Sequence, residues 1–407
     1  MTHPAWQSMC AAVTLSVALG FAQAADNGTP KDRLFARIYG SVAAATIGNS
    51  MGEPVEGWNW ERIEKTHGLV DRLLPGDRLT KDSTKPQRFG TPWVYRAYHR
   101  EPGWTEDGME RYKLLSSAII RKGGRITVED LAVEWVEKID PAKFGYHLGP
   151  QDQIIYNLLR AGVPPWEVGR YAAWPAFMGT SKMIQPVGIV NACRPDVAAR
   201  DALDLARIKD AQGRPDNFAV EVAAGIAAAT AEALRPGATV DSVVQAALAQ
   251  LPDVAGVADR RNGGRAEVAL GIQWARQAKH WKELRPLYEQ RYQWRAASLA
   301  TEILSGGLAC FYMAKGDPRE GIICAVNLGR DTDCKAYIAG GLGGALRGIE
   351  ALPGDWVETV EKAVLTDPYT VDKRTARQVA EGLYRAAVNE MRKTAAATSE
   401  IKALLAQ

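Results

Sequence analysis

The stretch that decides the fold is Asn327-Leu328-Gly329-Arg330-Asp331-Thr332-Asp333-Cys334, followed by the small-residue run Ala339-Gly340-Gly341-Leu342-Gly343-Gly344-Ala345. The run predicts a helix that packs closely against its neighbours. Asp331 and Asp333 stand one residue apart where this helix begins, and paired carboxylates suit hard divalent cations. Acidic residues in a first helical turn usually only cap the helix or complement its dipole, so this motif alone does not establish a metal site.

A second acidic turn lies far upstream, at Thr105-Glu106-Asp107. It opens a stretch over residues 106–122 whose apolar residues recur with helical spacing, and Thr105 is placed to be its N-cap. Because one chain contains two such acidic helix starts, we favour a shared metal site over two independent caps.

The apolar spacing is helical nearly throughout, and no sustained alternation of period two competes with it. We therefore predict an all-α protein, a compact orthogonal helical bundle. The predicted helices cover residues 31–47, 106–122, 128–138, 152–160, 197–208, 217–234, 239–251, 264–278, 296–314, 317–326, 332–349 and 355–364. Residues 57–103 and 141–149 are predicted to be loops because they are rich in Pro, Gly and charge.

Four separated blocks resemble the ADP-ribosylglycohydrolase (DraG-like) family. They are residues 40–56, the turn at 105–107, the weaker segment 179–186, and residues 327–353, which match the family's Asn-x-Gly-x-Asp-x-Asp-Thr block and its Gly/Ala-rich helix. The likeness extends from about Arg33 to Pro353. It implies an all-α fold, a metal-dependent hydrolase, and a centre that holds Mg²⁺.

The resemblance implies five oxygen ligands for one or two Mg²⁺ ions, with Mn²⁺ or Ca²⁺ as alternatives: Thr105, Glu106, Asp107, Asp331 and Asp333. A sixth position, Thr in the family, is Cys334 here, and a thiol is a poor ligand for Mg²⁺ or Ca²⁺. One of the two metal positions is therefore expected to be weak, empty or differently occupied. Asn327 is expected to fix the turn that presents Asp331.

The resemblance also implies catalytic roles for Glu56, Asp107 and Asp333, with Glu56 as a general acid/base or a gate. Without the family block, Glu56 would be read as a solvent-facing residue after a Pro turn. Cys334 as a covalent nucleophile is the sharpest alternative, but no His is placed by sequence to activate it.

Substrate contacts are predicted at Asn49, Trp58, Trp104 and Asp152. Each has a simpler interpretation: Trp residues more often fill a core, and Asp152 would cap a helix. Asn49 replaces the Asp usual in the family, and the segment 179–186 lacks the family's Arg. The family's metal-binding residues are thus better preserved in this sequence than the residues that recognise ADP-ribose.

The N-terminus resembles a secretory signal peptide over residues 1–24. Met9 to Ala22 is a short apolar run, and Ala22-Gln23-Ala24 is a small-residue cleavage pattern. The run is too short to span a bilayer, so we expect no membrane anchor and a periplasmic or secreted protein. The expected domains are the signal peptide, an all-α domain over 25–354, and a C-terminal helical extension over 355–407 that packs on the core, with a helix pair in residues 373–407.

Composition sets further bounds. The 407 residues are 46% hydrophobic and 24% charged, as in an ordinary globular protein, and the formal charge of +3 does not suggest nucleic acid. No phosphate-binding glycine loop of the nucleotide enzymes is present. Three of the cysteines, Cys193, Cys310 and Cys324, are expected to be free thiols, with a disulfide as the alternative in an oxidising compartment. The oligomeric state stays open.

Three functions remain. The leading one is an exported metal-dependent glycoside hydrolase acting on a small-molecule or oligosaccharide glycoside other than protein-linked ADP-ribose. The second is a true ADP-ribosyl hydrolase, and the third is a catalytically silent sugar-binding protein.

Overall fold

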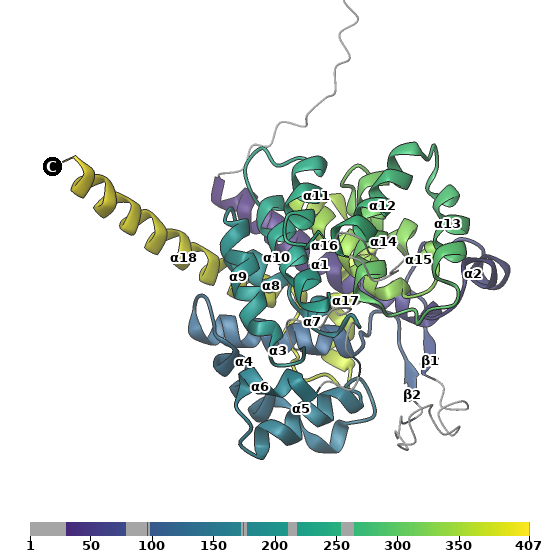
Figure 1. The fold of residues 1–407 in the computed structure, drawn as a ribbon. Coiled ribbons are helices and arrows are strands. Elements are labelled where there is room, and N and C mark those ends of the chain that lie inside the picture. The colour runs from purple at the N-terminus through teal and green to yellow at the C-terminus, as the bar shows by residue number, and fades with distance from the viewer. Residues whose placement is uncertain are drawn as a thin grey trace, which may run out of the picture.

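The structure, a computed structural model, describes residues 30–78, 96, 98–171, 174, 177–210, 218–253 and 264–406. Within that part of the chain the fold is all-α, as predicted, and its only β-sheet has two short strands (Figure 1). The α-helices are α1 (Pro30–Gly52), α2 (Trp60–His67), α3 (Asp107–Lys122), α4 (Val128–Lys138), α5 (Pro150–Arg160), α6 (Pro165–Val168), α7 (Gly179–Met183), α8 (Gln185–Val190), α9 (Pro195–Ala206), α10 (Ala219–Ala233), α11 (Val240–Leu248), α12 (Gly264–Gln277), α13 (Leu284–Tyr292), α14 (Ala300–Met313), α15 (Pro318–Leu328), α16 (Thr332–Arg347), α17 (Gly354–Thr366) and α18 (Ala376–Leu405). Short 3₁₀ turns are η1 (Glu53–Val55), η2 (Pro141–Lys143), η3 (Gly169–Tyr171), η4 (Trp281–Glu283) and η5 (Ile349–Ala351).

Helices α1 and α16 form the centre of the bundle, and the other helices surround them (Figure 1). Their small residues allow the two backbones to touch. A Cβ added to Gly344 would lie 2.1 Å from the carbonyl oxygen of Gly40, and one added to Gly52 would lie 2.4 Å from the backbone nitrogen of Asp333. Because only glycine permits this approach, the end of α1 is fixed directly against the acidic start of α16.

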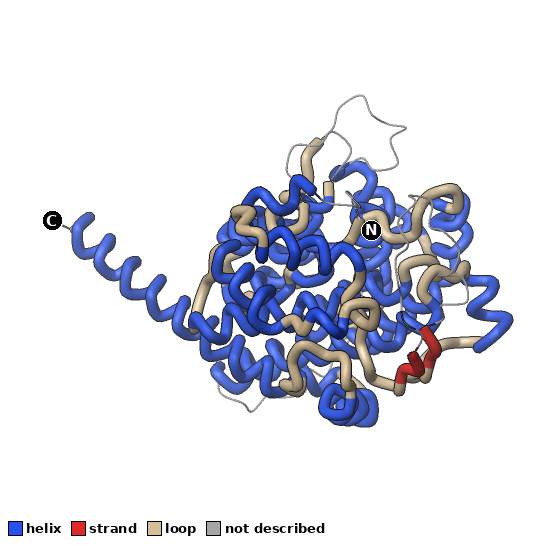
Figure 2. Tube along the Cα trace, turned by 90° about the horizontal axis from the view of Figure 1, so that it is seen from below, coloured by secondary structure: helices blue, strands red, loops and turns tan. Residues whose placement is uncertain are grey.

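The segment 57–103, predicted to be a loop, contains α2 and a small antiparallel sheet at the periphery of the molecule (Figure 2). Strand β1 (Gly76–Arg78) pairs with β2 (Tyr98–Arg100). Strands this short show no periodic signal, which is why the sequence did not reveal them. The sheet positions Arg100, whose buried guanidinium pairs with Glu53 and donates a 2.5 Å hydrogen bond to the carbonyl oxygen of Trp104, just before α3.

The C-terminal region packs on the core through α17 and the first part of α18, which lies against α1, α3 and α8. The prediction of a helix pair in residues 373–407 was wrong: α18 is one helix, because nothing in its Ala-rich sequence interrupts it. It begins at a capping box formed by Thr375 and Gln378, and its far end projects away from the body (Figures 1 and 2).

The predicted signal peptide, residues 1–24, lies outside the described residues. Among the helices of the described part, none has the length and apolarity that crossing a bilayer requires. The four cysteines of that part, Cys193, Cys310, Cys324 and Cys334, are free thiols.

Candidate active site

The two acidic helix starts meet inside the protein. The prediction that Thr105 is the N-cap of α3 was wrong: the helix begins one residue later, and Glu106 is its N-cap, with Oε1 accepting a 3.0 Å hydrogen bond from the backbone nitrogen of Gly108. Asn49, near the end of α1, joins Glu106 to the first turn of α16: its Nδ2 donates to Glu106 Oε1 at 2.8 Å and to Asp333 Oδ2 at 3.2 Å. Its Oδ1 accepts from the Glu106 backbone nitrogen at 3.2 Å. The two acidic motifs identified in the sequence therefore belong to one buried cluster.

A lysine that the sequence did not single out enters this cluster. Lys182, on α7, is 3% exposed, and its ammonium contacts Glu106 Oε1 and Asp333 Oδ2. These are the same two oxygens that the Asn49 amide contacts. A signal did exist: Lys182 directly precedes the mostly apolar stretch 183–190, and a lysine that is buried with such neighbours needs carboxylate partners.

Two carboxylate oxygens of the cluster stay without such a partner. Asp331 Oδ2 and Asp333 Oδ1 are buried, and no other group of the described chain donates a hydrogen bond to them. Asp331, Asp333 and Cys334 bring one potential ligand atom each within 4.8 Å of one another. Two neighbouring carboxylates that each keep an unpaired hard oxygen fit one divalent cation, and the adjacent thiol adds little to the affinity for Mg²⁺ or Ca²⁺.

Charge interactions divide the carboxylates of the cluster into two kinds. Burial alone would raise the pKa of Glu106, but the Lys182 ammonium and a hydrogen bond with Asp107 outweigh it and lower the pKa to about 2. Burial also opposes ionisation of Asp333, yet Lys182 keeps its pKa below the usual value. By contrast, burial and the nearby negative charge of Asp333 raise the pKa of Asp331 well above its usual range. The positive charge of Lys182 opposes this rise at Asp331 but does not offset it.

Asp107 belongs to a neighbouring ion pair. Its Oδ2 accepts a 2.6 Å hydrogen bond from Arg111, one turn further along α3. Arg111 also binds both oxygens of Asp152, at 2.5 and 2.9 Å. Desolvation and the Glu106 charge raise the pKa of Asp107, against the opposing effect of Arg111. Asp152 is fully buried in the first turn of α5, where its Oδ2 also accepts a hydrogen bond from the backbone nitrogen of Gly149, the N-cap; this contact fixes the carboxylate that binds Arg111.

A cleft with a volume of about 230 Å³ opens over these groups. Its lining combines acidic, basic and aromatic side chains, among them Glu56, Glu106, Asp107, Asp331, Arg111, Lys182, Lys209, Trp174, Phe177 and Cys334. Asp333 lies beneath the surface and is 0% exposed. The predicted acid/base residue Glu56, directly after η1, therefore shares a cavity with the predicted ligands.

Contacts on both sides hold the turn between α15 and α16 in place. Asn327 is buried; its Oδ1 accepts from the Val70 backbone nitrogen at 3.0 Å and its Nδ2 donates to the Val70 carbonyl oxygen at 2.8 Å. Arg330 has a positive φ of 67° and binds Glu302 with hydrogen bonds of 2.7 and 3.0 Å. Lys335 also reaches Glu302, at 3.1 Å. This network orients Asp331, the N-cap of α16, whose Oδ1 accepts from the Cys334 backbone nitrogen.

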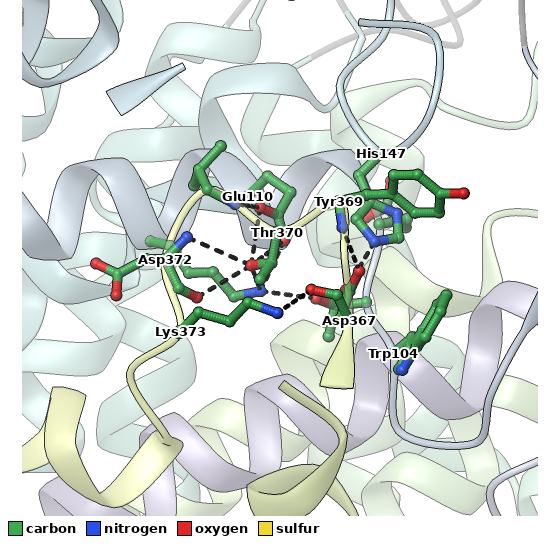
Figure 3. A network of polar contacts seen from close by, with 12 residues as sticks. Trp104, Glu110, His147, Asp367, Tyr369, Thr370, Asp372 and Lys373 are labelled. Atoms are coloured by element: carbon green, nitrogen blue, oxygen red, sulfur yellow. Dashed lines mark hydrogen bonds and ion pairs between the residues drawn. The ribbon is translucent and has the colours of Figure 1, made fainter. Parts of the chain in front are cut away.

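Thr105 and Trp104 face another part of the molecule. The Thr105 hydroxyl accepts a 3.2 Å hydrogen bond from Lys113, and both residues line a second cavity between α3 and the C-terminal region. Trp104 packs edge-on against His147 and Tyr369. Figure 3 shows it on the His147–Asp367 side of a polar network that ties the C-terminal region to α3.

The other end of that network lies around Glu110. The Thr370 hydroxyl contacts both carboxylate oxygens of Glu110 at 3.1 Å (Figure 3). Lys113 donates hydrogen bonds to Glu110 and Thr370. These contacts account for the burial of Glu110 and Lys113 without any ligand.

Trp58 lies outside the cleft as well. Its ring stacks on His67 at 5.7 Å, and the Arg62 guanidinium lies 3.7 Å above it. Its backbone forms an isolated β-bridge with Arg330, the residue before Asp331, so Trp58 is connected to the site through its main chain and not through its ring.

Comparison with known proteins agrees with this architecture. The family model for ADP-ribosylglycohydrolase matches residues 30–393, and the chain therefore belongs to the ADP-ribosylglycohydrolase family, a superfamily of hydrolases that generally uses divalent metals. The match extends beyond residue 354, the predicted C-terminal limit of the core domain.

Two individual relatives can be named. The chain is 25% identical over 331 residues to the uncharacterized protein YegU of Escherichia coli (strain K12), covering 78% of this chain and 89% of that protein. A solved structure described as an ADP-ribosylglycohydrolase-related protein complex superimposes with a TM-score of 0.55 at 20% identity, covering 88% of this chain and 99% of the other. This second likeness concerns the fold alone.

Proposed function

We propose that this protein is an exported glycoside hydrolase that depends on a divalent metal ion and acts on a carbohydrate or other small glycoside. One observation carries the proposal: Asp331 lines the same cleft as Glu56 and Asp107, and two buried oxygens, Asp331 Oδ2 and Asp333 Oδ1, have no hydrogen-bond partner among the described residues. A bound Mg²⁺, Mn²⁺ or Ca²⁺ ion would act there as a Lewis acid that orients sugar hydroxyls.

The chain's own residues supply the remaining functions. Glycoside cleavage needs a carboxyl group to move a proton at the leaving oxygen or at the attacking water. Glu56 is the candidate for this role because it lines the cleft and follows a turn rather than lying inside a helix. Arg111 holds Asp107 at the cleft wall, and the Asn327 and Glu302 contacts fix the turn that presents Asp331.

Export rests on the sequence of residues 1–24. An exported hydrolase would rarely meet ADP-ribosylated cytosolic proteins, and the absence of the family's Arg from residues 179–186 points the same way. Release of ADP-ribose from modified substrates is therefore the second candidate. A catalytically silent sugar-binding protein is the third, and Lys182 in the acidic cluster is the observation that favours it.

The test is hydrolysis of a panel by the protein beginning at Ala25. The panel contains aryl glycosides, plant and algal oligosaccharides and ADP-ribosylated peptides, each with Mg²⁺, Mn²⁺, Ca²⁺ or chelator. Asp333→Asn should abolish turnover. Asp253→Asn is the control and should leave turnover unchanged, because the Asp253 carboxylate is exposed and pairs only with Arg265 among the described residues. Cleavage of a plain glycoside that chelator stops supports the proposal; release of ADP-ribose alone supports the second candidate, and no turnover anywhere supports the third.

A further inference from the structure

Lys182 reaches the acidic cluster through a space that α3 leaves open for its aliphatic chain. Gly108 has no Cβ, and a Cβ there would lie 1.9 Å from Lys182 Cδ. The ammonium ends between two carboxylates that come from different helices, Glu106 at the start of α3 and Asp333 in the first turn of α16. Lys182 is therefore packed into the site along its whole length, and it is not a surface lysine whose end has merely turned inward.

The two oxygens that Lys182 contacts have their hydrogen-bonding partners in place. Glu106 Oε1 also accepts from Asn49 and from the Gly108 backbone nitrogen, and Asp333 Oδ2 also accepts from Asn49. A metal ion bound to these oxygens would have to displace the ammonium, because two cations this close in a buried site repel each other strongly.

The opposite holds on the other side of Asp333. Asp333 Oδ1 and Asp331 Oδ2 have no such donor: neither oxygen accepts a hydrogen bond from any Lys or Arg side chain of the described chain. Lys209, the other lysine that lines the cleft, pairs instead with Asp210 at 3.6 Å.

We infer that Lys182 is an internal cation that takes the place of one metal ion: the centre binds a single divalent ion, at Asp331 and Asp333, and none between Glu106 and Asp333. The inference rests on the proposed function in one respect only, that the centre holds a metal. It requires no particular substrate and no turnover.

The experiment counts bound ions. The full-length mature protein is dialysed against Mn²⁺, bound metal is measured per folded chain, and thermal unfolding is recorded with and without Mn²⁺. Wild type should bind one ion per chain. Lys182→Met keeps the length of the side chain but removes its charge, so it should bind two ions and gain more thermal stability from Mn²⁺ than wild type does. Lys209→Met, the matched control in the same cleft, should still bind one.

A second pair of variants covers the case in which Lys182→Met does not fold. Glu106→Gln should still bind one ion, since Glu106 is a lysine partner and not a ligand, whereas Asp331→Asn should bind none. A wild-type count other than one, the same count in folded Lys182→Met as in wild type, or loss of the ion in folded Glu106→Gln would overturn the inference. A single bound ion without any glycoside turnover would refute the proposed function and leave the inference intact.

Discussion

Replacing Glu302 by Gln tests how the site is held in position. Glu302 is fully buried on α14 and accepts three charge-assisted hydrogen bonds, two from Arg330 at 2.7 and 3.0 Å and one from Lys335 at 3.1 Å. Gln fills the same volume and keeps an acceptor oxygen, but it leaves two buried cations without a counter-charge. Removing one partner of a buried ion pair typically costs about 3–5 kcal/mol, so we expect the free energy of unfolding to fall by about that amount.

The assay is urea unfolding followed by circular dichroism, with the free energy extrapolated to water. Glu137→Gln is the control, because its partner Arg121 lies at 2.8 Å but the two side chains are 61% and 45% exposed. Exposed pairs contribute about 1 kcal/mol or less. The double variant Glu302→Gln with Lys335→Met should recover part of the loss, since one uncompensated charge is gone. If Glu302→Gln loses no more stability than Glu137→Gln, the reasoning is refuted.

Two further variants test contacts on either side of α3. Burial opposes ionisation of Asp372, but pairing with Arg374 outweighs it and keeps the pKa below its usual value. The Asp372 contacts therefore stabilise the folded state fully above the unfolded pKa of about 3.9, and this stabilisation is lost as the pH falls toward the lower folded pKa. Asp372→Asn should lower the free energy of unfolding by about 1–3 kcal/mol at pH 7 and by less at pH 3. Urea unfolding at both pH values checks this, and a pH-independent difference would contradict it. Gly108→Ala should displace the Lys182 side chain and lower the free energy of unfolding by about 1–3 kcal/mol. Its melting temperature should be lower than that of the control Gly354→Ala, whose added Cβ meets nothing within 4 Å. Equal melting temperatures would show that Lys182 does not depend on the space beside Gly108.

Local patterns were sufficient for most of the fold. Helical spacing and small residues predicted the all-α bundle, including the central helix after Asp333, because these signals depend only on neighbours along the chain. The same patterns identified both acidic helix starts. They missed the small sheet and the helices α2, α6, α7, α8 and α13, because these elements are too short or too mixed in polarity to show a clear period.

The interior of the site depended on contacts between distant segments. Lys182 was overlooked because a single lysine in a sequence does not reveal which carboxylates will surround it. Trp104 and Thr105 adjoin Glu106 in sequence, yet they line another cavity, since the chain turns as it enters α3. The roles predicted for these residues and for Trp58 stay predictions. Proximity in sequence to a ligand is therefore weaker evidence for a site than a shared cavity.

The most direct measurement is anomalous diffraction from crystals of the mature protein grown with Mn²⁺. The account predicts one anomalous peak per chain, beside Asp331 Oδ2 and Asp333 Oδ1, with the Lys182 ammonium still between Glu106 and Asp333. Two peaks with Lys182 displaced, or a peak between Glu106 and Asp333, would contradict it.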